Sequence, residues 1–129
     1  MIQDVPQFVP QDAEPLSAES LALPIACSLT SDELSQRGEE LDVLFARAID
    51  AREYPDGYGF AFPAESNEAR ALLDFVLFER ACCPFFTFSL AFPSPHTTVW
   101  LTVRGAEEAK SMLATTYQTV RARAIMAEG

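Results

Sequence analysis

The chain has 129 residues, of which 49% are hydrophobic and 22% charged, an ordinary globular composition at a single-domain length. Its formal net charge is −10. That charge repels phosphate backbones and anionic lipid, so we expect neither nucleic acid nor a membrane as a partner. The first residues show no basic region followed by an apolar run, and the cysteine count is 3. Without a predicted export signal or an even cysteine count, we expect a cytoplasmic protein with reduced thiols.

The N-terminal part of the chain shows three elements. Residues 1–22 mix prolines with acidic residues and have no apolar period, which predicts an extended arm ahead of a single domain at 23–129. The short apolar run at 23–29 predicts a strand. Thr30 and Glu33 match a capping box at the start of a helix. The apolar face of that helix comprises Leu34, Leu41, Leu44, Phe45, Ala48 and Ile49.

The middle of the chain predicts a turn, a strand and a helix. Residues 55–57 are Pro-Asp-Gly, a turn sequence, and the alternating aromatic residues in 58–62 predict a strand. The helix that follows continues to Cys83. Apolar residues surround almost its whole circumference, so we expect it to be largely buried. Pro84 ends it.

The last part of the chain predicts a hairpin and a final helix. The segments 86–92 and 98–103 both alternate apolar and polar residues, which is typical of an antiparallel pair of strands. An amphipathic helix follows Gly105. The resulting order β-α-β-α-β-β-α predicts an α+β fold, a two-layer sandwich with a mostly antiparallel sheet.

The segment Glu-Arg-Ala-Cys-Cys-Pro-Phe at 79–85 holds the candidate site. Glu79 precedes Cys82 and Cys83 by three and four residues, so its carboxylate lies on the same side of a helix as the thiols. Arg80 lies three residues before Cys83. Charges in a nearly apolar helix are costly unless paired, and we interpret Glu79 and Arg80 as ligand-binding residues. Two buried cysteines also fit simple packing in a Phe-rich core.

The position of the cysteine pair favours metal chemistry over nucleophilic chemistry. The helix dipole opposes a thiolate at a helix C-terminus, and a disulfide between adjacent residues is strained. A soft metal ion supplies the missing positive charge and deprotonates thiols outright. Cys27, ahead of a predicted helix, offers a third sulfur. We therefore predict that Cys27, Cys82 and Cys83 bind a thiophilic metal ion or a thiol-reactive small ligand. Zinc is less favoured because spaced cysteine pairs are missing.

Four segments carry a resemblance to a known family: "CSLT" at 27–30, "ERACCPF" at 79–85, and "VWLTVRG" followed by "AEEAKSML" at 99–113. Over about residues 25–114, the chain resembles small uncharacterised bacterial proteins with a C-S-L segment and an E-R-x-C-C-P-F motif, some encoded near heavy-metal resistance genes. The resemblance implies that the cysteines and Glu79 belong together. It implies no activity.

Two other functions fit the same residues. A structural or interaction module would form a homodimer through a Phe-rich surface, with the cysteines only packing. An enzyme with Cys83 as nucleophile ranks third, so catalytic residues are not assigned. His96, the only histidine, lies in a Pro/Ser loop, where a histidine is more often exposed than functional.

Overall fold

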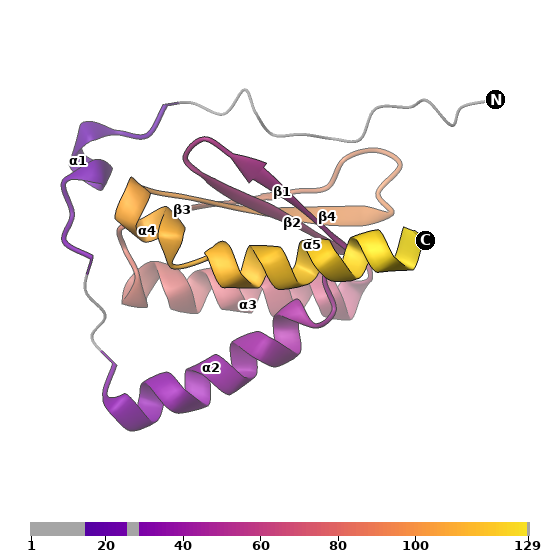
Figure 1. Ribbon diagram of the computed structural model, residues 1–129, viewed down its shortest axis with the longest axis horizontal. Coiled ribbons are helices and arrows are strands. Elements are labelled where there is room, and N and C mark those ends of the chain that lie inside the picture. The colour runs from indigo at the N-terminus through magenta and orange to yellow at the C-terminus, as the bar shows by residue number, and fades with distance from the viewer. Residues whose placement is uncertain (1–14, 26–28, 129) are drawn as a thin grey trace.

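The computed structural model describes residues 15–25 and 29–128, and these residues form an α+β fold (Figure 1). The helices are α1 (Ala18–Leu21), α2 (Ser31–Phe45), α3 (Ser66–Cys82), α4 (Glu107–Ser111) and α5 (Ala114–Glu128). The strands are β1 (Asp50–Tyr54), β2 (Gly57–Pro63), β3 (Thr87–Ala91) and β4 (Thr98–Arg104). They form one sheet in the order β1-β2-β4-β3, and each neighbouring pair is antiparallel. The predicted fold class and antiparallel sheet are confirmed.

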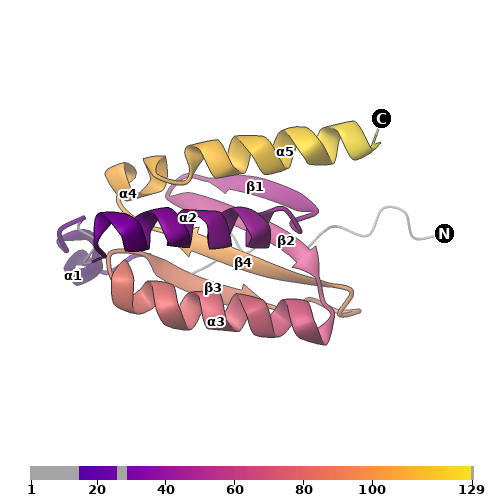
Figure 2. The same cartoon turned by 90° about the horizontal axis from the view of Figure 1, so that it is seen from below.

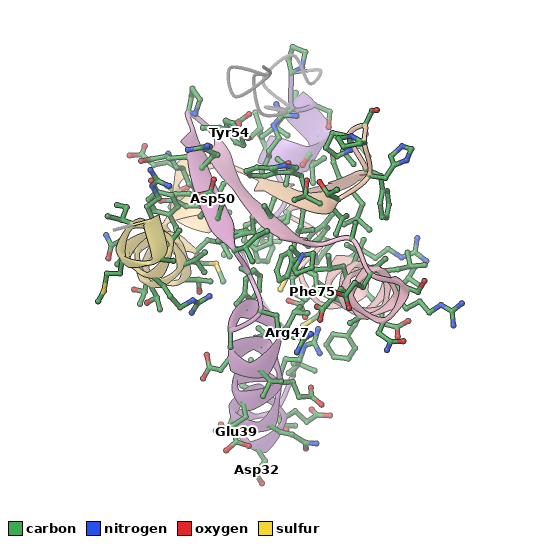
Figure 3. All side chains as sticks on the ribbon, turned by 90° about the vertical axis from the view of Figure 1, so that its right-hand side faces the viewer. Asp32, Glu39, Arg47, Asp50, Tyr54 and Phe75 are labelled. Atoms are coloured by element: carbon green, nitrogen blue, oxygen red, sulfur yellow. The ribbon has the colours of Figure 1, made fainter. Side chains whose placement is uncertain are left out.

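The long helices lie on one side of the sheet. α3 and α5 flank the face, and α2 crosses between them in the view from below (Figure 2). Viewed along the sheet, α2 projects away from it, with Arg47 near the sheet and Asp32 at the far end (Figure 3). α2 and α3 run in opposite directions (Figure 2), and the long side chain of Arg37 in α2 reaches Glu79 near the end of α3. This contact positions the candidate site. No helix of the described residues is both long and apolar enough to cross a membrane.

The core lies between the sheet and the helices. The predicted alternation in β2 is confirmed, since Tyr58, Phe60 and Phe62 all belong to the buried cluster. In register with them, β4 contributes Val99, Leu101 and Val103 to the same face. Helix residues complete this cluster, among them Phe45, Leu72, Phe75 and Val120. The ring of Phe45 meets that of Phe60 edge-on, with centroids 4.9 Å apart. Most of the phenylalanines near the sheet are therefore internal.

The first half of the chain differs from the predicted order. The expected strand at 23–29 is wrong for its described residues, because 23–25 and 29 adopt no strand. The sheet instead recruits β1, which follows α2 and pairs with β2 across a tight turn. A hairpin partner two residues away closes a far smaller loop than a distant segment does, which favours β1. Residues 26–28 lie outside the described residues. In the predicted arm, residues 18–21 form the short helix α1.

The helix α3 is less buried than predicted. Its buried stripe runs through Glu68, Leu72, Phe75, Glu79 and Cys82, which is one face at helical spacing. The opposite face is open: Leu73 is 48% exposed, Leu77 44% and Phe78 43%. The expectation of burial around almost the whole circumference is therefore wrong. α2 and the sheet cover only one side of α3.

Both ends of α2 are fixed by side chains. At its start, the Thr30 side chain accepts a hydrogen bond from the Glu33 amide, and the Glu33 carboxylate accepts one from the Thr30 amide. The predicted capping box is confirmed, and these hydrogen bonds lower the pKa of Glu33. After its end, Arg123 of α5 donates to the carbonyls of Phe45 and Ala48, at 2.8 and 3.0 Å.

Candidate functional site

The adjacent cysteines lie at the C-terminal end of α3. Cys82 is the last helical residue and Cys83 follows it, and both are buried. The Cys83 amide donates to the carbonyl of Glu79 at 2.6 Å, which completes the last helical turn. The chain then leaves the helix, because Pro84 disfavours helical geometry in the residue before it. Both cysteines pack in a small cluster with Phe85 and Ala109, and Leu29 lies against this cluster.

Glu79 lies one turn before Cys83 and is also buried. Its Oε1 atom is 4.0 Å from the Cys83 Sγ atom, a weak S–H···O contact. Its Oε2 atom accepts a hydrogen bond from Arg37 Nε at 3.0 Å. The carboxylate is thus held between a cation on one side and a thiol on the other. A buried carboxylate needs such a partner, because burial of an unpaired charge is strongly unfavourable.

Arg37 of α2 supplies the cation that pairs with Glu79. Its guanidinium lies over the Phe78 ring, with Cζ 4.2 Å from the ring centroid. It also contacts Glu40 through Nη1, at 3.3 Å. Arg80 is exposed, and the cation that contacts Glu79 is Arg37. The guanidinium stacks on the Phe78 ring and donates hydrogen bonds to both Glu79 and Glu40. These contacts hold it in place, and it in turn fixes the orientation of the Glu79 carboxylate.

Glu79 and Cys83 line a cavity of about 180 Å³. Its remaining walls are mostly apolar and come from α2, α3, β3, β4 and the α4–α5 junction. Four of the ten phenylalanines contribute, namely Phe45, Phe75, Phe86 and Phe88. Met112 and Leu113 belong to the break between α4 and α5, where a single final helix was predicted. A small apolar space with a thiol and an oriented carboxylate on its wall is the candidate site.

The other predicted site residues lie elsewhere. Cys27 lies outside the described residues. Within residues 15–25 and 29–128, no group of three or more His, Cys, Asp or Glu side chains is arranged to hold a metal ion. His96 is exposed in the loop after β3. Cys83 precedes β3 and His96 follows it, so the two residues lie beyond opposite ends of that strand.

Arg37 was missed by sequence reasoning, although its position carried a signal. It follows Leu34 by three residues and precedes Leu41 by four, so it lies on the apolar face of its helix. A cation on an apolar helix face predicts a buried partner or an aromatic one. Glu79 lies in the same way on the buried stripe of α3. The two patterns together indicate an ion pair between the helices.

Comparisons of the chain with protein-family models, with curated proteins and with solved structures find no match. The resemblance to small bacterial proteins with the E-R-x-C-C-P-F motif stays a prediction. The functional argument therefore depends on the geometry of the cavity and its residues.

Proposed function

We propose that this protein binds a small thiol-reactive molecule or a thiophilic metal ion at the cavity beside Glu79, with Cys83 as the sulfur ligand at the cavity wall. The observation that carries the proposal is that a thiol and an oriented carboxylate face one small, otherwise mostly apolar space. Soft cations prefer sulfur ligands. A carboxylate beside the sulfur favours a ligand that brings positive charge.

The dimensions of the cavity restrict the ligand. A space of about 180 Å³ is smaller than the ~300–1,000 Å³ typical of drug-sized ligands. Its aromatic walls favour a small apolar group rather than a hydrated one. An organic mercury or arsenic compound has both features, a soft centre and a compact hydrocarbon part. When such a compound R–Hg–X reacts, the sulfur–mercury bond forms, the mercury–X bond breaks, and the thiol proton leaves with X as HX.

The other two cysteines have supporting roles in this proposal. Cys82 lies next to Cys83 and gives a second sulfur for a centre that takes two thiols. Cys27 remains the third sulfur on sequence grounds. Leu29, which packs against the cysteine cluster, lies two residues later in the sequence. Arg37 orients Glu79.

Titration of the anaerobically purified protein with phenylmercuric acetate tests the proposal, combined with metal analysis. We expect one equivalent to bind tightly to the folded wild-type chain. Cys83→Ser should abolish this binding, and Arg80→Gln should leave it unchanged because Arg80 is exposed. Phenylarsine oxide forms two sulfur–arsenic bonds and releases its oxygen with the two thiol protons as water. Its binding should be lost in Cys83→Ser and in whichever of Cys82→Ser and Cys27→Ser removes the second sulfur. Undiminished mercurial binding by Cys83→Ser contradicts the proposal.

A homodimer is the second candidate, and the outer face of α3 favours it. Leu73, Leu77 and Phe78 are each exposed by more than two fifths there. A neighbouring copy would cover this apolar face. The sequence-based hypothesis of a homodimer expected a Phe-rich surface, but most of the phenylalanine rings lie in the core. Leu73 and Leu77 would therefore make most of the contact between the two copies. Sedimentation of the wild type across a range of concentrations tests this candidate, since a constant monomer mass contradicts it.

A further inference from the structure

A methionine lies on the wall of the same cavity as the proposed thiol. Met112 follows the last residue of α4, at the break before α5 (Figure 1), and it lines the space of about 180 Å³ together with Cys83 and Glu79. Ala109, one turn earlier, is fully buried in the cluster that holds Cys82 and Cys83. The Met112 amide donates to the Ala109 carbonyl at 3.1 Å. This turn places Met112 next to the cysteine cluster, at the edge of the cavity.

The Met112 side chain is a soft ligand with room to move. It is 53% exposed and also lines the cavity, so it lies between the space and the solvent. The three rotatable bonds of methionine allow its sulfur to turn inward. A thioether sulfur is neutral, and Cu(I) is the ion that thiolate and thioether ligands select. Zinc is bound in proteins by cysteine, histidine and carboxylate groups instead. The pair of Cys83 and Met112 therefore favours copper in its lower oxidation state.

The charges beside the cavity favour a monovalent ion. While the thiol is protonated, the buried Glu79 carboxylate and the Arg37 guanidinium balance each other as −1 and +1. Loss of the thiol proton from Cys83 adds −1, and an ion of charge +1 restores the balance. A divalent ion would leave a net positive charge in a mostly apolar site, where an unbalanced charge is costly. The nearby carboxylates of Glu40 and Asp42 are exposed, so water weakens their effect.

We infer that the cavity binds one cuprous ion between the Cys83 thiolate and the Met112 thioether, with the Glu79–Arg37 pair beside it. This inference rests on the proposed function, because it uses the same cavity and thiol, and it adds the identity of the metal and its second ligand. When the ion binds, the sulfur–copper bond to Cys83 forms, the S–H bond breaks, and the proton leaves to solvent. The Met112 sulfur donates a lone pair and loses no group. Copper stays Cu(I) throughout, so no electron is transferred.

Anaerobic titration with the acetonitrile complex of Cu(I), in competition with a chromophoric Cu(I) chelator, measures the affinity. We expect one equivalent to bind to the wild-type chain. Met112→Leu should lower the affinity about tenfold or more, a loss that is common even for the outer groups of a metal site. Leucine has nearly the volume of methionine, so the variant should fold. The matched control is Met126→Leu, the same change at a residue of α5 that is 80% exposed, and it should keep the wild-type affinity.

X-ray absorption at the copper edge identifies the second ligand. In protein labelled with selenomethionine, we expect a selenium atom at bonding distance from the copper. This signal should persist in Met126→Leu and disappear in Met112→Leu. A methionine that only packs beside the site would not produce it.

Four outcomes overturn the inference. They are no binding of Cu(I), equal affinities of Met112→Leu and Met126→Leu, a copper ion without a selenium neighbour, or tight binding of Zn²⁺ at the same site. A loss of Cu(I) affinity in Cys82→Ser with Met112→Leu unaffected also overturns it, because the second sulfur would then belong to a cysteine.

Phenylmercuric acetate separates this inference from the proposed function. The phenyl carbon is already one of the two ligands of that mercury, so Met112→Leu should bind it as the wild type does. If phenylmercury binds through Cys83 and Cu(I) does not bind, the proposed function stands and this inference fails. If Cys83→Ser binds phenylmercury undiminished, the proposed function itself fails.

Discussion

The two ends of the α2–α3 pair use the same chemistry in opposite ways. At one end, Glu79 pairs with Arg37, and their side chains are only 11% and 18% exposed. At the other end, Glu68 is equally buried, but its partner Arg47 is 59% exposed. One oxygen of Glu79 faces a thiol beside a small cavity and the other pairs with Arg37, whereas the second oxygen of Glu68 is buried without a hydrogen-bond partner among the described residues. The Glu79 carboxylate is therefore satisfied on both oxygens, and the Glu68 carboxylate on one.

The largest effect should come from removing each arginine in turn. Arg37→Met leaves the Glu79 carboxylate buried without its cation, which costs about 3–5 kcal/mol of folding free energy. Arg47→Met should cost less than that, because water can enter where the exposed Arg47 stood, but more than about 1 kcal/mol, because the Glu68 carboxylate that remains is itself buried. Urea unfolding of both variants measures the difference. Equal losses would mean that the two ends are not distinct in the way described.

An intermediate effect should appear in the reactivity of the cysteine at the enclosed end. Glu79→Gln removes the negative charge 4.0 Å from the Cys83 sulfur. A neighbouring carboxylate disfavours a thiolate, so we expect alkylation by iodoacetamide at pH 7 to become about tenfold faster. Glu68→Gln serves as the control, since Glu68 pairs with Arg47 and does not line the cavity with Cys83, so the rate should stay unchanged. A slower reaction in Glu79→Gln would show that the carboxylate assists the thiol instead.

The smallest effect concerns how α2 begins, at the end nearer Arg37. Thr30→Ala removes an N-cap hydrogen bond and should cost about 1 kcal/mol in urea unfolding. The same box lowers the pKa of Glu33. The ionised Glu33 carboxylate therefore stabilises the folded state. This stabilisation is fully present above the ordinary carboxyl pKa, and it is lost as the pH falls through the lower pKa that Glu33 has in the folded state. The difference between wild type and Thr30→Ala should shrink in that acidic range. A pH-independent difference would exclude a role for Glu33 in the cap.

The periodicity of apolar residues in the sequence predicted most of the helices and strands. It failed for β1, whose structure depends on its pairing with another strand. The period-2 alternation of β2, β3 and β4 and the helical period of α3 are visible in short windows of sequence. The strand β1 has the sequence Asp-Ala-Arg-Glu-Tyr, which has no apolar alternation. It is a strand because it pairs with β2 through a short turn. The apolar segment at 23–25 has no such neighbour.

The candidate site shows the same division. The contact between Glu79 and Cys83 follows from their spacing of four residues on one helix. The partner of Glu79 is 42 residues away in sequence, and only the packing of α2 on α3 brings it close. For this reason sequence reasoning placed Arg80, the nearest cation in the sequence, at the candidate site and missed Arg37. The pair formed by Glu68 and Arg47 likewise depends on how α3 lies beside the end of α2.

Arg123 of α5 donates to the carbonyl groups where α2 gives way to the sheet. One guanidinium therefore ties the last helix to a segment 75 and 78 residues earlier in the sequence. Removal of residues 123–129 would take this guanidinium away and leave both carbonyls without it.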